Sequence, residues 1–350
     1  MPPLYVIEQG AKVHVEGRRL LVKKEDAELS SAPLVSVSEV VLMGNVGLTT
    51  QAIKLLLSEN VDVVFLTEDG NYCGRLTGPA TPHVLLRRKQ YAAQADAGFA
   101  LKMGQAMVRG KLLNERSLLL RHNRERKDAA TRDHPHASST EWDSRVSAIA
   151  EAVRALEGAL ERIPRTTTAN SLAGVEGAAT AAYFGAWKRL LKTDWHFEKR
   201  LRRPPPDPIN VLLSFGYTLL TRTAWSAVEA AGLDPYAGFL HVVDYNRPSL
   251  ALDLVEEFRA VVDGVILWCV NSGQIVPEDF AKGDEHRPVV MSDKAKRVFI
   301  GAYERRMEEM ILHPPSNERL SVRRCIMAQA REMVRCIQKG EPEYGAMVFR

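Results

Sequence analysis

The stretch TGPATP (77–82) decides the fold, because its two prolines and one glycine interrupt strand and helix patterns alike. On its N-terminal side, short β-type runs surround a single helix-like segment at 49–60. These runs lie at 4–8, 12–16, 18–24, 37–44 and 62–70. We therefore expect a small β-rich N-terminal domain over residues 1–82 that ends at this break.

On the C-terminal side the pattern changes to long helices with apolar residues three and four positions apart. The helical patterns lie at 84–127, 144–162, 171–192, 209–231, 249–270, 293–310 and 317–339. A polar segment at 127–143 predicts an exposed loop, and the final GEPEYGAMVFR has little to pack. The predicted fold class is α+β with two domains. The β-rich domain is followed by a larger all-α domain at 83–340 and a C-terminal tail at 341–350.

The 350 residues are 45% hydrophobic and 26% charged, which is typical of a soluble globular protein. A formal net charge of +4 permits nucleic-acid binding without establishing it. The longest apolar run, near 261–270, is interrupted by Asp263 and is too short to span a bilayer. With no signal peptide visible, we expect a soluble cytoplasmic protein without membrane attachment. P-loop, dinucleotide, GxSxG and HExxH motifs are absent, so nucleotide hydrolysis, redox and serine-hydrolase chemistry lack support.

The segment NSLAGVEGAATAAYFGAW (170–187) carries one charged residue, Glu176, among alanines and glycines. Such small side chains suit a helix packed tightly against its neighbours, although the glycines also suit the close approach of a ligand. An unpaired buried carboxylate costs several kcal/mol, so Glu176 should be protonated, paired or bound to a metal. The alternative is an exposed position at a helix edge or a pair with an arginine.

A second segment, GFLHVVDYNRPSLALDLVEEFR (238–259), places His241 before a turn and two acids after it. Asp253 and Glu256 lie three residues apart, so their side chains share one face of the predicted helix. Taken singly, each of these groups is ordinary in a structural role. Together with Glu176 they form a set of oxygen ligands with one imidazole, which suits Mg²⁺ or Mn²⁺. Glu257 points elsewhere and is expected to be a surface or pairing residue.

Basic residues cluster in WKRLLKTDWHFEKRLRR (187–203), where seven Lys or Arg side chains alternate with Trp and Phe. This composition predicts a surface that follows a phosphate backbone with aromatic anchors, or else an ordinary salt-bridged helix face. The candidate DNA-binding residues are Lys188, Arg189, Lys192, Arg200, Arg203 and, in the turn of the previous segment, Arg247.

Three segments in order, 170–187, DPINVLLSFGYTLL (207–220) and 232–259, resemble the CRISPR-associated integrase/endonuclease of spacer acquisition. The N-terminal LYVIEQGAKVHVEGRRLLV is also similar to that family, so the resemblance covers essentially the whole chain. It implies that Glu176, His241 and Glu256 are the catalytic, metal-binding residues. Asp253 and Tyr217 then fall on supporting positions.

The same resemblance implies a metal-dependent DNA endonuclease/integrase that uses Mg²⁺ or Mn²⁺. In this chemistry the 3′-hydroxyl of an incoming prespacer attacks a phosphodiester at the CRISPR repeat, and water in its place gives nuclease activity. The implied partners are double-stranded DNA, a second copy bound through the N-terminal domain, and a small ferredoxin-like partner dimer. Two alternatives stay open: a non-catalytic DNA-binding scaffold of the same complex, and a transposon-encoded integrase of the same fold.

Overall fold

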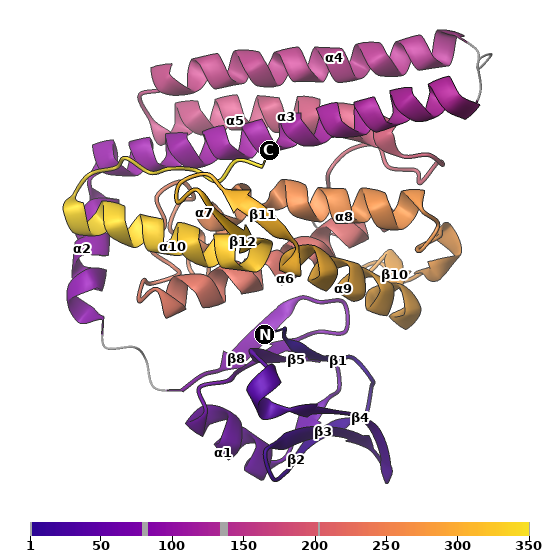
Figure 1. The fold of residues 1–350 in the computed structure, drawn as a ribbon, viewed down its shortest axis with the longest axis vertical. Helices are drawn as coiled ribbons and strands as arrows, with labels where there is room; N and C mark the ends of the chain where they lie inside the picture. Colours follow the sequence, from indigo (N-terminus) through magenta and orange to yellow (C-terminus); the bar gives the residue numbers. More distant parts are fainter. Residues whose placement is uncertain (1, 79–82, 134–138, 202–203, 350) are drawn as a thin grey trace. The chain divides into compact units, whose positions relative to one another are not determined.

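The computed structural model describes residues 2–78, 83–133, 139–201 and 204–349. The chain divides into two compact units, Met1–Thr81 and Pro82–Arg350 (Figure 1). Strands and one helix make up the first unit, whereas helices dominate the second. The predicted fold class, a β-rich region followed by a mostly helical one, is confirmed.

The first unit contains two four-stranded sheets. One has the order β1-β5-β7-β8, in which β1, β5 and β7 are parallel and β8 is antiparallel. The other has the order β4-β3-β2-β6, antiparallel except for the β2–β6 pair. The elements are β1 (Leu4–Val6), β2 (Lys12–Glu16), β3 (Arg19–Lys24), β4 (Ala27–Pro33), β5 (Glu39–Met43), β6 (Gly47–Leu48), α1 (Thr50–Ser58), β7 (Asp62–Leu66) and β8 (Tyr72–Leu76).

The core of this unit forms because strand side chains alternate between an inner and an outer face. Val13, Leu20, Val40 and Val63 from the strands are fully buried together with Leu56 of α1. The sequence pattern missed β4, because its residues are almost all exposed and carry no apolar alternation. It also missed β6, which has two residues, and β8, none of whose residues is fully buried. Apolar alternation therefore predicts the strands that face the core and misses strands that are short or largely exposed.

The second unit is built from nine helices of eight residues or more among the described residues. They are α2 (Val84–Ala95), α3 (Ala97–Asp133), α4 (Ser139–Arg162), α5 (Ala169–Trp187), α6 (Pro208–Ala230), α7 (Ser249–Glu256), α8 (Arg259–Asn271), α9 (Asp293–Glu308) and α10 (Val322–Lys339). The loop predicted at 127–143 is helical at both of its ends, because α3 runs to Asp133 and α4 begins at Ser139. The residues between these two helices lie outside the described part of the chain.

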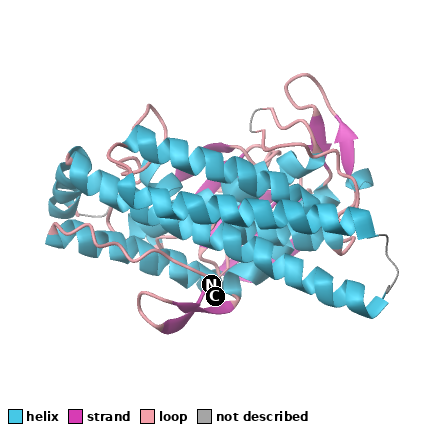
Figure 2. Ribbon diagram, turned by 90° about the horizontal axis from the view of Figure 1, so that it is seen from above, coloured by secondary structure: helices cyan, strands magenta, loops and turns pink. Residues whose placement is uncertain are grey.

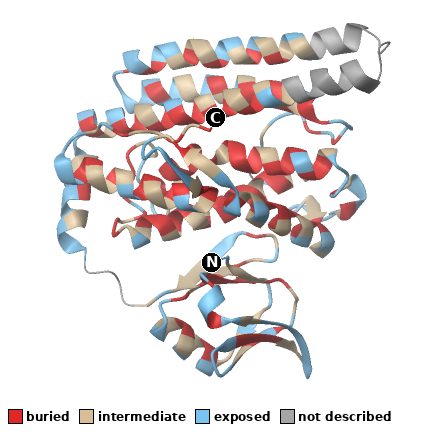
Figure 3. Cartoon of the chain, viewed as in Figure 1, coloured by how far each residue is buried: buried red, intermediate tan, exposed pale blue. Residues whose placement is uncertain are grey.

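Helices α3, α4 and α5 lie side by side, with α3 also packed on α7 and α8 (Figures 1 and 2). Burial is heaviest in α7 and is also extensive in α6 and α8 (Figure 3). Helix α5 begins with a capping box, in which Thr168 and Ser171 satisfy each other's backbone N–H groups. The packing of α3 on α5, α7 and α8 brings α3, α5 and the α7–α8 junction together. No helix among the described residues has the length and apolar character that a membrane span requires.

The helix expected over 249–270 is two helices, with α7 ending at Glu256 and α8 beginning at Arg259. Phe258 at the junction leaves the helical region, with φ −109° and ψ 0°. Apolar periodicity continued across this break because both helices bury their apolar residues, so the pattern did not reveal it. The break turns the direction of the chain immediately after Glu256.

Two further expectations about this unit are wrong. The region is not all-α, because two antiparallel hairpins interrupt it: β9 (Phe280–Lys282) with β10 (Val289–Met291), and β11 (Met310–His313) with β12 (Glu318–Ser321). The C-terminal tail is not loosely packed either. Its Tyr344, Met347 and Phe349 are buried, because polar groups of α3 and the α7–α8 junction bind its backbone.

Candidate metal centre

The centre of the second unit is an ammonium group held between two carboxylates from different helices. Lys111 of α3 forms ion pairs with Glu176 of α5 and with Glu256 of α7, the latter at 2.8 Å from Nζ to Oε2. The side chains of Lys111 and Glu256 are 4% and 5% exposed, whereas that of Glu176 is 26% exposed. The two acids that the sequence analysis singled out therefore meet, through a cation that it did not identify.

His241 lies beside this ion pair in a fixed orientation. Its Nδ1 is 2.7 Å from Oδ1 of the fully buried Asp253, and its Nε2 is 3.7 Å from Oε1 of Glu256. Because the Asp253 carboxylate accepts from Nδ1, that nitrogen carries a ring proton, and Nε2 is the nitrogen that faces Glu256. Nε2 is therefore the nitrogen available as a ligand.

Asp253 also organises the loop that carries the imidazole. Its two oxygens accept hydrogen bonds from the backbone N–H groups of Phe239, Leu240 and His241, at 2.6, 3.0 and 2.9 Å. A Cβ at Gly238 would lie 2.8 Å from Oδ2 of Asp253, so the loop can wrap the carboxylate only with glycine there. The predicted supporting acid thus orients both the imidazole and its backbone.

Positive charge keeps Glu256 ionised. Burial alone would raise the pKa of Glu256, but the charges of Arg259 and Lys111 hold that pKa well below its usual range. The Arg259 guanidinium lies 2.8 Å from Oε1 of Glu256. Burial likewise opposes the charge on Lys111, yet Glu256, Glu115 and Glu176 raise its pKa well above the ordinary value. Burial raises the pKa of Glu115 itself to about 8.

Tyr217 of α6 supports the centre indirectly. Its hydroxyl donates to Oδ1 of Asp263 at 2.6 Å, and Tyr183 donates to Oδ2 at 2.7 Å. Burial raises the pKa of Asp263 to about 6. The Arg259 guanidinium lies over the Tyr217 ring, 4.6 Å from its centroid. Tyr217 therefore packs against the arginine that pairs with Glu256, rather than against the carboxylate itself.

The face of α5 around Glu176 is open rather than tightly packed. A Cβ built at Gly174, Gly177 or Gly185 would meet no heavy atom within 4 Å. The prediction of close packing at these glycines is therefore wrong, because they face outward, whereas α5 itself packs on α3 and α4 and buries residues such as Ala179 and Tyr183. Glu176 is thus both partly exposed and paired, with Thr180 Oγ1 donating to it at 2.9 Å.

The candidate DNA-binding residues lie in different environments. Arg189 and Lys192 are exposed, while Lys188 pairs with Glu198 at 2.9 Å. Arg200 is occupied within the fold, since it donates to Oδ1 of Asn210 at 2.9 Å and to Ser214 Oγ at 3.1 Å. The remaining two are Arg247, half-buried in its turn, and Arg203, which lies outside the described residues.

The aromatic residues of the same segment are not surface anchors. Trp187, Trp195 and Phe197 are 0%, 2% and 5% exposed. Trp187 and Phe197 pack edge to face, with ring centroids 5.6 Å apart. The prediction of interleaved aromatic anchors is therefore wrong, because these rings fill the interior next to α5.

The carboxylates and the imidazole of this centre are ligand types that suit a hard divalent cation, although they are not already arranged as a metal-binding group. Among the described residues, no three His, Cys, Asp or Glu side chains already lie in metal-binding positions. The ammonium of Lys111 instead stands where two carboxylates converge. Carboxylate oxygens with one imidazole nitrogen are suitable ligands for Mg²⁺ or Mn²⁺. Glu176, Glu256 and His241 are therefore the residues that could hold one.

Three charged residues of this centre escaped the sequence analysis: Lys111, Glu115 and Arg259. Lys111 and Glu115 lie in a long helix rich in Lys and Arg, where nothing in the pattern separates a buried charge from a solvated one. Their spacing of four residues, which places both on one helix face, was the available signal.

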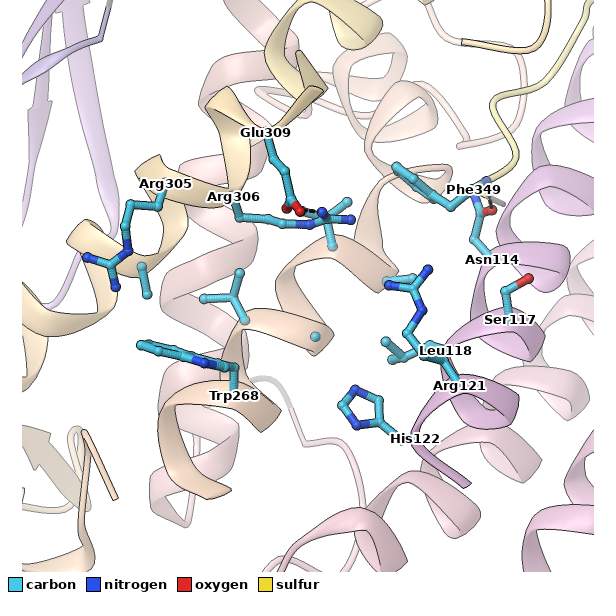
Figure 4. A pocket seen from close by; sticks show the side chains of 15 residues that line it. Asn114, Ser117, Leu118, Arg121, His122, Trp268, Arg305, Arg306, Glu309 and Phe349 are labelled. Carbon is cyan, nitrogen blue, oxygen red and sulfur yellow. Dashed lines mark hydrogen bonds and ion pairs between the residues drawn. The ribbon is translucent and has the colours of Figure 1, made fainter. Parts of the chain in front are cut away.

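A separate cavity of about 530 Å³ lies between α3, α8 and α9 (Figure 4). Arg121, Arg305 and Trp268 line it, and the Arg305 guanidinium lies 5.5 Å from the Trp268 ring centroid. Among the described residues, its lining includes none of the ligand candidates. The cavity and the charged centre are distinct places in the second unit.

Comparison with known proteins identifies the family. The sequence model described as CRISPR associated protein Cas1 matches residues 4–305. A CRISPR-associated endonuclease Cas1 from Chlorobaculum tepidum is 35% identical over 351 residues, covering 99% of this chain and 98% of its own. One from Thermus thermophilus is 35% identical over 350 residues, covering 99% of this chain and 97% of its own.

Solved structures agree in fold. A casposase bound to an integration product has a TM-score of 0.81 at 20% identity, covering 97% of this chain and 92% of its own. A Cas1 protein from Thermotoga maritima has a TM-score of 0.76 at 23% identity, covering 97% of this chain and 98% of its own. At these identities the likeness establishes the fold alone. With the family match and the full-length relatives, it follows that the chain belongs to the Cas1 family of CRISPR-associated proteins.

Proposed function

We propose that this chain is a metal-dependent DNA endonuclease and integrase that inserts new spacers into a CRISPR array. The observation that supports it is the convergence of Glu176 and Glu256 on one cation position, with Nε2 of His241 facing the same carboxylate. Carboxylates from two helices that converge on one position suit the binding of Mg²⁺ or Mn²⁺. Family membership supports the nuclease class independently.

Glu176, Glu256 and His241 would hold the metal, which supplies positive charge to stabilise the phosphate in the transition state. Asp253 keeps the proton of His241 on Nδ1, so that Nε2 can act as a ligand. Arg259 and Lys111 keep Glu256 ionised before any metal arrives. Loading requires the Lys111 ammonium to leave the position between the two carboxylates.

The reaction is a transesterification. The 3′-oxygen of the incoming fragment forms a bond to the phosphorus at the repeat boundary as the bond from phosphorus to the original 3′-oxygen breaks. The number of phosphodiester bonds is unchanged, and the proton of the attacking hydroxyl ends on the displaced oxygen or in solvent. Water in place of the hydroxyl gives hydrolysis at the same centre.

The proposed substrate is double-stranded DNA, both prespacer and CRISPR repeat. Arg189 and Lys192 offer exposed positive charge next to α5, and the glycine face of α5 beside Glu176 allows a close approach. One structural neighbour is a casposase bound to an integration product, and another, at TM-score 0.80 and 24% identity, is part of a Cas6-RT-Cas1–Cas2 complex. By analogy we propose a homodimer assembled with a small ferredoxin-like partner dimer.

An integration and cleavage assay on labelled DNA tests this function. Wild-type protein with its partner should be active in Mn²⁺ or Mg²⁺ and inactive with a chelator. Glu176→Ala should abolish both products while binding DNA with unchanged affinity. Glu161→Ala, at an exposed position of α4, is the matched control and should behave as wild type. Full activity of Glu176→Ala would refute the assignment and favour a scaffold role.

A further inference from the structure

The last residues of the chain form a strap, residues 344–349, that is fastened to the carboxylate next to the metal centre. Tyr344 donates its hydroxyl to Oε1 of Glu257 at 2.5 Å. The backbone N–H of Met347 donates to Oε2 at 2.5 Å, and Gln329 Nε2 donates to the same oxygen at 2.8 Å. Glu257 was expected to be a surface or pairing residue, but it is 0% exposed. Its carboxylate is satisfied by these neutral hydrogen-bond donors rather than by a cation.

The other edge of the strap is bound by α3. Asn114 donates from Nδ2 to the carbonyl oxygens of Glu257 and Met347, at 2.8 and 2.9 Å, and accepts from the N–H of Phe349 at 2.8 Å. The Phe349 ring packs edge to face on Phe258, with centroids 5.9 Å apart. One asparagine thus ties together the strap, α3 and the α7–α8 junction.

The strap fits because α3 has no side chain at residue 110. A Cβ at Gly110 would lie 2.8 Å from Cβ of Ala346 and 3.4 Å from the carbonyl oxygen of Met347. Helix α3 is otherwise regular at this position, and glycine costs a helix about 1 kcal/mol relative to alanine. The close approach of the strap is the physical reason for glycine here.

These contacts surround the two segments that carry the buried ion pair. Glu257 directly follows Glu256, while Gly110 and Asn114 flank Lys111 on α3. We propose that Glu257 and Tyr344 are positioning residues of the metal centre, and that the strap clamps the α7–α8 junction to α3 and thereby fixes Glu256 among the metal ligands. This inference rests on the proposed function, because it concerns the same centre.

Glu256 reaches the centre from the last turn of a short helix, directly before the bend at Phe258. A chain bend without fixed contacts would let the carboxylate move relative to Glu176. Loss of an outer partner of a metal ligand typically lowers metal affinity about 10–100-fold. We therefore expect weaker metal binding when the strap is loosened, with the reaction itself recovered at saturating metal.

The test compares two tyrosine variants of the full-length protein. Tyr344→Phe removes one of the three donors to Glu257, whereas Tyr303→Phe removes a hydroxyl at a fully buried site of α9, 3.1 Å from Thr223 Oγ1. Mn²⁺ binding is measured by calorimetry without DNA, and circular dichroism checks folding. Tyr344→Phe should raise the Mn²⁺ dissociation constant about 10-fold or more. Tyr303→Phe should leave the dissociation constant unchanged, even where both variants lower the melting temperature.

Gly110→Ala provides a second route, because alanine favours the helix while its Cβ would press on Ala346 of the strap and lie against Glu257. It should weaken Mn²⁺ binding in the same direction, and excess Mn²⁺ should restore the DNA reaction of both strap variants. Wild-type Mn²⁺ affinity in Tyr344→Phe and Gly110→Ala would overturn the positioning role alone. A wild-type protein that bound no Mn²⁺ and left DNA intact would overturn the proposed function, and this inference with it.

Discussion

Two neighbouring buried carboxylates at the α7–α8 junction have different kinds of partner. Glu256 is ion-paired with Lys111 and Arg259, which hold its pKa well below the usual range despite burial. Glu257 is bound by neutral donors, and burial raises its pKa to about 8. A carboxylate held by cations stays ionised and can exchange one cation for another, whereas one held by hydrogen bonds fastens the chain. The first arrangement suits a ligand and the second a fixed support.

Removing the cation should give the largest effect on stability. Lys111→Met removes the ammonium that pairs with both Glu176 and Glu256, so we expect the free energy of unfolding in chelator to fall by about 3–5 kcal/mol. Lys294→Met, which breaks a pair between an exposed lysine and Asp279, should cost at most about 1 kcal/mol. Urea denaturation measures both. Equal losses would mean that Glu256 is not held by charge.

Changing the acid behind the imidazole should have the next largest effect. Asp253→Asn replaces an acceptor for three backbone N–H groups and for Nδ1 of His241, so the ring loses its fixed proton position. We expect Mn²⁺ affinity to fall about 10–100-fold. Asp244→Asn in the exposed turn nearby should leave affinity unchanged. An unaffected Asp253→Asn would show that His241 does not depend on Asp253.

The dependence of stability on pH should separate the two kinds of carboxylate. Burial raises the pKa of Glu115 and of Glu257 to about 8, so around pH 7 the folded chain retains two protons that the unfolded chain has released. The free energy of unfolding must then fall as pH rises, by about 1.4 kcal/mol per pH unit for each group. Glu115→Gln should halve this slope in chelator, as urea denaturation across neutral pH would measure.

The exposed Glu151→Gln on α4 is the control for that series and should keep the full slope. A slope unchanged by Glu115→Gln would mean that Glu115 is already ionised in the fold. In contrast, Glu256 has a lowered pKa, so its contribution is present above its ordinary pKa and is lost only in acid.

The smallest effect should come from Asp263, another buried carboxylate and one held by tyrosine hydroxyls. Tyr217→Phe removes one donor while Tyr183 keeps the other, so we expect a loss of about 1 kcal/mol in the free energy of unfolding. Tyr183→Phe should cost a similar amount. A loss as large as that of Lys111→Met would contradict the distinction between ion-paired and hydrogen-bonded carboxylates.

The sequence predicted the two-part fold because local signals mark it: prolines and glycine at 77–82, alternation before them and helical periodicity after them. It missed the bend at Phe258, because α7 and α8 are both buried and their apolar residues follow one continuous pattern. It also missed the packing of the tail, which depends on Asn114 and Glu257, more than eighty residues away in sequence.

The candidate centre was predictable in part. Glu176 stood out as one charge among small residues, and resemblance to a known family connected it with His241 and Glu256. Lys111 and Arg259 could not be found in this way, because a buried cation and a surface cation have the same sequence signature. Likewise, the aromatic residues at 187–197 suggested a binding surface, although their burial depends on the packing around α5.

The buried lysine also allows metal binding at the centre to be followed by chemical modification. Acylating reagents attack only the unprotonated amine, and Lys111 is almost inaccessible and holds its proton far more strongly than a surface lysine does. Surface lysines should therefore be modified while residue 111 is spared. A divalent ion that displaced the ammonium would separate Lys111 from the carboxylates that raise its pKa. The extent of acylation at residue 111, read by peptide mass spectrometry, would then report metal loading in the absence of DNA.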